Sequence, residues 1–289
     1  MKFRPLTPNF GAEISKVDLS QDLDQPTFDA IERAFNENTV LLFRDQKLTE
    51  EQHVRFSRRF EKLEVHTMRE FVRPDNPEIF VLSNIIEDGR PIGNKDAGGV
   101  WHTDLSYTKA PSRGSILYAL EIPYDEAGQS LGNTLFTSSA YAYESLSESM
   151  KERLNNMKAV HGLWERHEKD RTAAGQAHMI ITDPKRRAQV PDVVHPIVRT
   201  HPLTGRKCLY VNEGQTTRVE GMKEDESRAL LDELFTHSTR PEYIYRHSWR
   251  VHDLVMWDNC GALHRVSNEY KLPQRRLMHR TTLAGGEVF

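Results

Sequence analysis

Short apolar runs bounded by glycine, proline or asparagine recur along most of this chain, and they constrain its fold more than any other feature. The runs lie at 39–43, 80–82, 115–120, 134–136, 197–199, 207–211, 243–245 and 254–257, and a segment of alternating polar and apolar residues follows at 276–283. Runs of this length, separated by turn-forming residues, are typical of antiparallel strands in a sandwich or barrel. We therefore expect a mainly β protein.

Helical patterns are confined to the start of the chain and to two later intervals. Apolar residues recur at helical spacing over 28–35, and Thr49 with Gln52 forms a capping box that opens a second helix. Further helices are expected at 139–157, with a break near Ser147, and at 223–235. Because 289 residues fit one sandwich or barrel, the prediction is a single domain, 1–289, with a β core and helical decoration.

One segment, at about 163–194, has the composition of a surface excursion. It is polar, basic and weakly periodic. Long stretches of this kind inside a domain are functional lids or loops without fixed order. The sequence therefore predicts an insertion or lid here.

Charge and composition exclude several classes of partner. The net charge of −3 carries no basic footprint for nucleic acid, and no apolar stretch is long enough to cross a membrane. The N-terminal residues lack the apolar core of a secretory signal, and Cys208 and Cys260 have no framework spacing. These features predict a cytoplasmic protein with two reduced cysteines.

The stretch "GGVWHTDLSY", residues 98–107, contains a pair of side chains suited to metal binding. His102 and Asp104 are two residues apart, so on an extended strand both would leave the same face and could bind one ion. The alternative is a buried histidine beside a solvated aspartate. Of the 13 histidines, only His102 begins an H-x-D or H-x-E pair.

A ferrous ion held by two histidines and one carboxylate needs a third ligand from elsewhere in the chain. His264, in "LVMWDNCGALHRV", is the best candidate because it follows the predicted strand 254–257 and the turn after it. Loop residues on a rigid scaffold often carry function. A buried histidine satisfied by hydrogen bonds is the alternative.

The final predicted strand carries two arginines that indicate anionic ligands. Arg276 and Arg280, in "LPQRRLMHRTTL", are four apart and share a face of a strand. Inward-facing guanidinium groups are costly unless they meet carboxylates or similar anions. The alternative is two exposed arginines on an edge strand.

Five motifs in order, WHTD, GNTLF, VNEGQTTR, LVMWDN with LHR, and QRRLMHRTTL, resemble the taurine dioxygenase/TfdA family of Fe(II)- and 2-oxoglutarate-dependent dioxygenases. The similarity covers nearly the whole chain. It implies a double-stranded β-helix core, the jelly-roll or cupin-like fold. It also implies Fe(II) as the metal, with 2-oxoglutarate and O₂ as cosubstrates.

The resemblance assigns roles residue by residue. Iron would be bound by His102, Asp104 and His264, and 2-oxoglutarate by Thr134 and Arg276. The prime substrate would contact Arg280 and His66, with Trp101, Leu105, Tyr107 and Gln215 near its pocket. Family resemblance also favours a homodimer or homotetramer.

The implied reaction is hydroxylation of a small anionic compound, coupled to decarboxylation of 2-oxoglutarate to succinate and CO₂. Taurine-specific members carry asparagine, tyrosine and phenylalanine where this chain has Gly98, Arg69 and Gln215. The substrate is therefore either a sulfonate, such as taurine or a related alkylsulfonate, or an aryloxy-carboxylate of the 2,4-D type. A non-catalytic ligand-binding homologue and a desaturase acting on another carboxylate are the alternatives.

Overall fold

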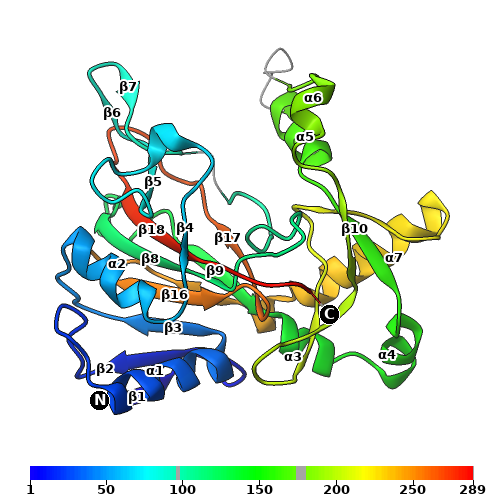
Figure 1. Ribbon diagram of the computed structural model, residues 1–289, viewed down its shortest axis with the longest axis horizontal. Coiled ribbons are helices and arrows are strands. Elements are labelled where there is room, and N and C mark those ends of the chain that lie inside the picture. The colour runs from blue at the N-terminus through cyan, green and yellow to red at the C-terminus, as the bar shows by residue number, and fades with distance from the viewer. Residues whose placement is uncertain (96–97, 174–179, 289) are drawn as a thin grey trace.

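Two β-sheets form the centre of the chain in the computed structural model, which describes residues 1–95, 98–173 and 180–288 (Figure 1). The larger sheet has the order β1-β2-β3-β16-β8-β18-β4, and β5 also pairs with β18. The smaller sheet has the order β15-β9-β17. The mainly β character predicted from the short apolar runs is confirmed.

The bounds of the strands are as follows. The larger sheet contains β1 (Lys2–Pro5), β2 (Ala12–Ser15), β3 (Val40–Phe43), β4 (Leu63–Glu64), β5 (Phe80–Ser83), β8 (Gly114–Glu121), β16 (Leu254–Asp258) and β18 (Leu277–Leu283). The smaller sheet contains β9 (Thr134–Ser138), β15 (Tyr245–His247) and β17 (Ala262–Val266). Peripheral pairs and ribbons contain β6 (Ile86–Glu87), β7 (Arg90–Pro91), β10 (Lys158–His161), β11 (Val193–Pro196), β12 (Val198–Thr200), β13 (Lys207–Leu209) and β14 (Thr216–Val219).

Helices flank these sheets. They are α1 (Gln25–Asn38), α2 (Glu50–Arg58), α3 (Ser139–Glu144), α4 (Glu148–Leu154), α5 (Trp164–Ala173), α6 (Pro184–Arg187) and α7 (Glu224–Ser238), with 3₁₀ turns at Arg69–Phe71 and Pro241–Tyr243. Among the described residues, no helix is long and apolar enough to cross a membrane.

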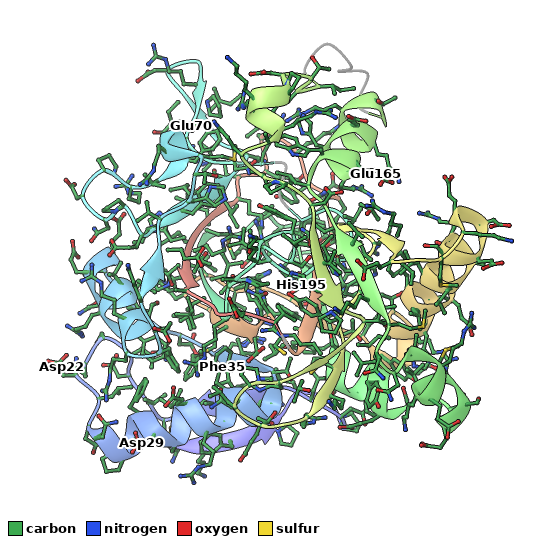
Figure 2. All side chains as sticks on the ribbon, turned by 45° about the vertical axis from the view of Figure 1, so that its right-hand side comes forward. Asp22, Asp29, Phe35, Glu70, Glu165 and His195 are labelled. Atoms are coloured by element: carbon green, nitrogen blue, oxygen red, sulfur yellow. The ribbon has the colours of Figure 1, made fainter. Side chains whose placement is uncertain are left out.

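The larger sheet is buried on both faces, which explains the unbroken apolar sequence of β3. Leu41 and Phe43 pack against α1 and α2, whereas Val40 and Leu42 face the smaller sheet. Side chains alternate between faces along a strand, so a doubly covered strand needs apolar residues at every position. Figure 2 labels Phe35 of α1. Its side chain is fully buried in the core between the larger sheet and the helices. The two apolar layers fix the larger sheet as the platform of the fold.

The helix starts follow their sequence signals. The Asp24 carboxylate accepts from the Thr27 backbone N–H and caps α1. The predicted capping box of α2 is confirmed, since Thr49 and Gln52 each bond to the other's backbone N–H. Ser147 caps α4, so the predicted break near this residue is also confirmed.

Some elements differ from the predictions. No helix was predicted in the segment 163–194, expected to be an insertion or lid, but it contains α5, α6 and the start of β11; its residues 174–179 lie outside the described part. The Trp164 indole donates to the Val190 carbonyl at 2.9 Å and ties the two ends of the segment together. The strand expected at 243–245 begins at Tyr245, because Pro241 opens a 3₁₀ turn before it.

Candidate metal and cosubstrate site

His102 and His264 are joined by their backbones, although they are far apart in the sequence. The His102 N–H donates to the His264 carbonyl at 3.0 Å, and the His264 N–H donates to the His102 carbonyl at 2.8 Å. This antiparallel bridge adds His102 to the edge of β17. Two sequence predictions were wrong in detail: His264 lies within a strand and not in a loop, and Asp104 begins a turn and does not continue a strand.

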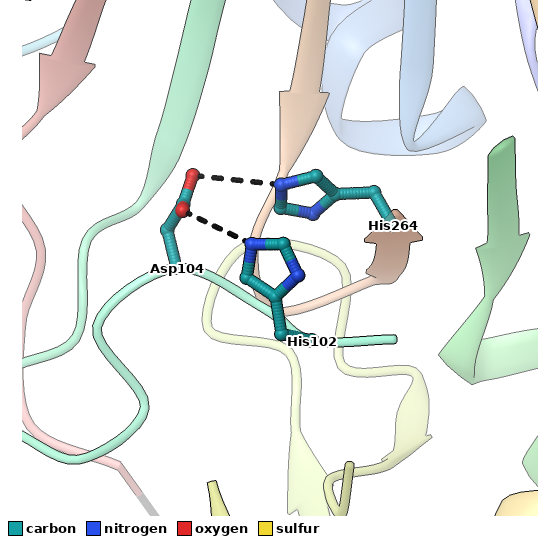
Figure 3. Close-up of side chains that lie close together, drawn as sticks. All are labelled: His102, Asp104 and His264. Atoms are coloured by element: carbon teal, nitrogen blue, oxygen red, sulfur yellow. Dashed lines mark ion pairs between the residues drawn. The ribbon is translucent and has the colours of Figure 1, made fainter. Parts of the chain in front are cut away.

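The turn directs Asp104 back toward both imidazole rings (Figure 3). The His102 Nε2 atom lies 3.8 Å from Asp104 Oδ1, and the His264 Nε2 atom lies 3.9 Å from Asp104 Oδ2. One ligand atom from each of the three side chains lies within 4.8 Å of the others. The group predicted from sequence is therefore assembled in space.

The hydrogen bonds of the rings suit this group to a cation. His102 Nδ1 lies 2.8 Å from the Val100 carbonyl, an acceptor, so Nδ1 carries the proton and Nε2 presents a lone pair to Asp104. Burial holds the pKa of His264 well below its ordinary value, so this ring is neutral at pH 7. The Nε2 lone pair of His102 faces the Asp104 carboxylate, and two electron-rich groups that face one another favour a cation between them. Two imidazoles and one carboxylate are the donor set of non-haem ferrous sites.

Asp104 is ionised despite its burial. Burial alone raises the pKa of this carboxyl, but Arg280, the two histidines and a hydrogen bond from Ser115 lower it well below the ordinary value. Arg280 Nη1 lies 3.4 Å from Asp104 Oδ1, and the Ser115 hydroxyl donates to Oδ2 at 2.6 Å.

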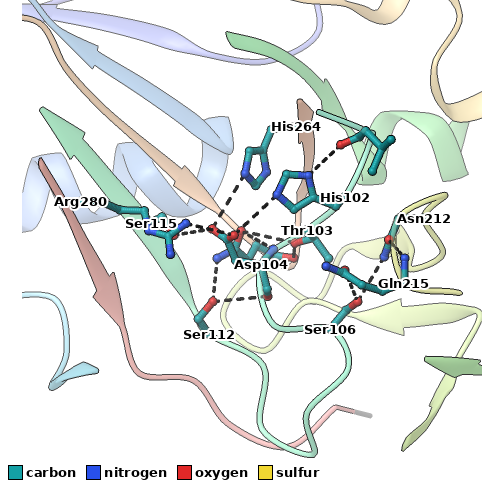
Figure 4. A network of polar contacts seen from close by, with 12 residues as sticks. His102, Thr103, Asp104, Ser106, Ser112, Ser115, Asn212, Gln215, His264 and Arg280 are labelled. Carbon is teal, nitrogen blue, oxygen red and sulfur yellow. Dashed lines mark hydrogen bonds and ion pairs between the residues drawn. The ribbon is translucent and has the colours of Figure 1, made fainter. Parts of the chain in front are cut away.

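A second layer of polar groups holds the turn that carries Asp104 (Figure 4). The Thr103 hydroxyl donates to the Asn259 carbonyl at 2.7 Å. The Asn259 side chain donates to Ser112 at 2.8 Å and accepts from the Trp257 indole at 3.0 Å. The turn after β16 thus supports the turn that carries Asp104.

A cavity opens beside the two histidines, and its lining includes Arg280 of β18 and Arg276, the residue just before that strand. Its lining residues are Leu82, Ser83, Asn94, Lys95, Gly98, His102, Leu117, Thr134, Trp257, His264, Val266, Tyr270, Arg276 and Arg280. Arg276 is buried, and its Nε has no hydrogen-bond partner within the described part of the chain. A buried guanidinium with a free donor is a binding group for a carboxylate. The inward orientation predicted for Arg276 and Arg280 is confirmed by their place in the cavity wall.

Thr134 lies in the same cavity, and sequence reasoning missed the residue that orients it. The Trp249 indole donates to the Thr134 hydroxyl oxygen at 3.0 Å. The hydroxyl proton of Thr134 is therefore free to be donated to another acceptor. Trp249 precedes β16 and carries no motif in the sequence, so only the fold reveals this contact.

His66 and Arg280 both lie against the ring of Phe80. The His66 ring stacks on Phe80 with centroids 3.8 Å apart, and the Arg280 guanidinium carbon lies 5.3 Å from the Phe80 centroid. Burial, with a contribution from Arg280, lowers the pKa of His66 to about 4. His66 Nδ1 accepts from the Met68 N–H at 3.1 Å, which leaves the Nε2 proton as a donor.

The remaining predicted pocket residues differ in position. Burial, with a contribution from the Asp104 carboxylate, raises the pKa of Tyr107 to about 12, but Tyr107 does not line the cavity. Gln215 accepts from the Ser106 hydroxyl at 2.8 Å. Leu105 has a positive φ of 60° at the turn, and neither it nor Gln215 lines the cavity. Trp101 packs with Leu135 and Leu263, on the face of β17 opposite to His264.

Two of the positions that depart from the taurine-specific pattern are placed clearly. Gly98 has a φ of +83°, and a Cβ atom there would lie 3.3 Å from His102 Cε1. A side chain at this position would therefore press on the His102 ring. Arg69 is exposed and does not line the cavity.

Another buried group of metal-ligating residue types, His201, Asp258 and Cys260, is satisfied internally. His201 Nδ1 accepts two backbone N–H groups at 3.2 Å, so Nε2 carries the proton that it donates to Asp258 at 2.9 Å. A protonated Nε2 has no lone pair for a metal. Cys208 and Cys260 are free and buried, as the cysteine spacing predicted.

Comparisons with known proteins agree with this geometry. Residues 2–282 match the profile of the family described as "Taurine catabolism dioxygenase TauD, TfdA family". The chain is 35% identical over 293 residues to the alpha-ketoglutarate-dependent 2,4-dichlorophenoxyacetate dioxygenase of Cupriavidus pinatubonensis, covering 96% of each chain. It is 33% identical to the pentalenolactone F synthase of Streptomyces arenae, covering 93% of this chain and 90% of that protein.

A solved structure is also similar. The crystal structure of AAD-2 in complex with Mn(II) and N-oxalylglycine superposes with a TM-score of 0.82 at 30% identity, covering 99% of both chains. N-oxalylglycine is an analogue of 2-oxoglutarate. The chain therefore belongs to the TauD/TfdA family of Fe(II)- and 2-oxoglutarate-dependent dioxygenases.

Proposed function

We propose that His102, Asp104 and His264 hold the Fe(II) ion of this dioxygenase. The observation that carries the proposal is the convergence of two imidazole Nε2 atoms on one ionised carboxylate, at 3.8 and 3.9 Å. Bound Fe(II) supplies the activation of O₂ through oxidative decarboxylation of 2-oxoglutarate. The chain's part is to fix three ligands on one side of the ion and leave the other side open.

Arg276 and Thr134 would hold 2-oxoglutarate. The cavity places both beside His102 and His264, and the buried guanidinium of Arg276 has a free donor. Two backbone bonds fix Arg276: its N–H donates to Asn84 Oδ1 at 2.9 Å, and its carbonyl accepts from Ser83 at 2.8 Å. A guanidinium held this way binds the remote carboxylate, while the Thr134 hydroxyl donates to the same group.

Arg280 and His66 would hold an anionic prime substrate. Leu105 and Tyr107 do not line the cavity and would act on the substrate only through the turn that carries Asp104. Arg280 supplies a positive charge, and neutral His66 supplies an Nε2 proton. These donors suit a sulfonate or a carboxylate. The similarity to a 2,4-dichlorophenoxyacetate dioxygenase and Gly98 beside His102 support an aryloxy-carboxylate at least as well as an alkylsulfonate. Gln215, which bonds to Ser106, would act on this pocket only through the turn.

The decisive assay is succinate formation from 2-oxoglutarate with purified protein, Fe(II), ascorbate and air. The panel contains alkylsulfonates including taurine, alkyl sulfate esters and aryloxy-carboxylates. We expect one class to stimulate succinate release and to be hydroxylated in equal amount. A desaturated product would identify the enzyme as a desaturase instead of a hydroxylase. Binding of Fe(II) and 2-oxoglutarate without turnover of any compound would favour a non-catalytic homologue.

Three further features belong to this proposal. The two sheets that enclose the core around Phe136 and Trp257 would form a double-stranded β-helix. The segment 163–194 would act as a lid, because Arg166 of α5 lies 4.0 Å from Glu213, in the loop that contacts the backbone of Trp101. The homodimer or homotetramer and the cytoplasmic location stay predictions. Size-exclusion chromatography with light scattering tests the oligomeric state.

A further inference from the structure

We infer that Tyr270 and Gly132 close the cosubstrate cavity at Arg276, and that they select 2-oxoglutarate over longer 2-oxo diacids. The inference rests on the proposed function of Arg276 as the group that binds the remote carboxylate. Its basis is the packing of the Tyr270 ring and the Gly132 backbone against the Arg276 side chain.

The Tyr270 ring forms part of the cavity wall beside Arg276. Both residues line the cavity together with Thr134, His102 and His264. The guanidinium carbon of Arg276 lies 5.9 Å from the centroid of the Tyr270 ring, within the range of cation–π attraction. Burial lowers the pKa of Arg276, and Tyr270 opposes this effect. The phenol therefore lies at the guanidinium that would receive the remote carboxylate.

Gly132 packs against both of these side chains. A Cβ atom at this position would lie 2.8 Å from Tyr270 Cε1 and 3.0 Å from both Cδ and Nε of Arg276. Contacts this short leave no room for a methyl group, so the ring and the guanidinium fit against bare backbone. The φ of +66° is also one that glycine adopts readily. Any side chain here would have to displace Tyr270, Arg276 or both.

Hydrogen bonds hold the segment that carries Tyr270 against the segment that carries Gly132. The N–H and the hydroxyl of Ser267 both donate to the Asn133 carbonyl, at 2.8 and 3.0 Å. Ser267 is three residues before Tyr270, and Asn133 directly follows Gly132. The two parts of the wall are therefore fixed relative to one another.

A fixed wall at this place limits the length of the cosubstrate. A 2-oxo diacid whose 2-oxo end is held at the metal must reach Arg276 with its remote carboxylate. Two methylene groups separate these ends in 2-oxoglutarate, and 2-oxoadipate has one methylene more. The extra methylene would push the carboxylate toward the Tyr270 ring and the Gly132 backbone. One methylene in a closely fitting pocket changes discrimination by about 10–200-fold.

The test compares the Kd of 2-oxoglutarate with that of 2-oxoadipate for the Mn(II)-loaded protein, by calorimetry without O₂. Tyr270→Ala removes the ring, and Tyr270→Phe is its control because it removes only the hydroxyl. Gly132→Ala places a methyl group in the contact. Gly205→Ala is its control, because Gly205 has a φ of +71° and nothing lies within 4 Å of its Cβ position. Thermal unfolding without added metal reports on folding.

We expect the wild type and Tyr270→Phe to prefer 2-oxoglutarate by at least about tenfold, and Tyr270→Ala to reduce that preference by at least about tenfold. Gly132→Ala should bind 2-oxoglutarate more weakly than Gly205→Ala does, because its methyl group displaces the wall.

Three results would overturn the inference: equal binding of the two acids by the wild type, an unchanged preference in Tyr270→Ala, or 2-oxoglutarate binding in Gly132→Ala as tight as in Gly205→Ala. Arg276→Ala separates this inference from the proposed function. Undiminished 2-oxoglutarate binding in that variant would refute the cosubstrate site itself, whereas weaker binding there with an unchanged preference in Tyr270→Ala would refute only the wall.

Discussion

Trp249 donates its indole proton to the hydroxyl oxygen of Thr134 at 3.0 Å, and both side chains are buried. This contact decides which way the threonine hydroxyl can act, because its oxygen already accepts a bond and its proton remains to be donated. The strand β9 therefore presents a donor to the cavity that contains Arg276.

Removing that orientation should weaken 2-oxoglutarate binding specifically. Trp249→Phe deletes the indole donor and keeps an aromatic side chain in the core. We expect the KM for 2-oxoglutarate to rise about fivefold, since a neutral hydrogen bond contributes about 1 kcal/mol, with a smaller change in the KM for the prime substrate. Equal increases in both constants would show a general loss of structure and contradict the orienting role.

Arg276 and Arg280 should have separable roles. Arg276→Ala removes the buried guanidinium and is expected to raise the 2-oxoglutarate requirement on the order of 100-fold, because truncating one partner of a buried charged pair costs at least about 2–5 kcal/mol. Arg280→Ala should chiefly raise the KM of the prime substrate. Steady-state kinetics with each ligand varied in turn checks this, and matching effects of the two variants would refute the division.

Metal binding should stabilise the protein through Asp104. With Mn(II) at 100 times its Kd, the free energy of unfolding of the wild type should rise by about 2.7 kcal/mol. Asp104→Ala should fold, because the core contacts lie elsewhere, but should gain nothing from added Mn(II). Denaturant unfolding with Mn(II) and with EDTA measures both. A metal-induced gain that survives in Asp104→Ala would place the metal at another site.

Gly98→Ala tests the close approach at the metal-binding ring. The new Cβ would lie 3.3 Å from His102 Cε1, and the φ of +83° is one that residues other than glycine rarely adopt. We expect weaker Mn(II) binding and lower turnover. Gly128→Ala is the matched control, because Gly128 also has a positive φ but nothing lies within 4 Å of its Cβ position. If Gly128→Ala loses as much Mn(II) affinity as Gly98→Ala, backbone strain alone would explain the effect, and the contact with His102 would not be its cause.

Stability should fall in acid because of buried neutral histidines. Burial lowers the pKa of His53 and of His161 to about 3, against about 6.5 in the unfolded chain. Between pH 6.5 and 3 the unfolded chain binds more protons, so the free energy of unfolding decreases as the pH is lowered, by up to about 1.4 kcal/mol per unit for each histidine. Above pH 6.5 these two groups contribute no slope. Urea unfolding from pH 4 to 8 measures the slope, which His161→Gln should reduce; an unchanged slope would contradict this origin.

The sequence predicted those parts of the fold that depend on local pattern. The break before α4 was predictable because Ser147 is a good cap, and the apolar run of β3 because both of its faces are buried. Helix α5 was missed because its charged residues surround the whole helix and leave no apolar stripe. Strand β17 was not predicted, because Gly261, the residue before it, is typical of a turn.

The candidate site likewise contains residues that the sequence pattern identified and residues that only the fold brings together. Residue type and spacing identified His102 and Asp104, whereas Ser115, Trp249 and Asn259 reach the site only through strand pairing and side-chain contacts. A serine in a strand has no distinguishing neighbour in the sequence. Its role depends on the turn at Asp104, whose direction the H-x-D spacing alone did not predict correctly.

The backbone bridge between His102 and His264 has a consequence for biosynthesis. His102 comes much earlier in the sequence than His264, and each residue supplies a backbone hydrogen bond that holds the other. A nascent chain that still lacks β17 on the ribosome has no edge on which to align His102. If His102 and His264 hold the iron as proposed, metal loading in this geometry has to wait until β17 has been synthesised and paired with His102.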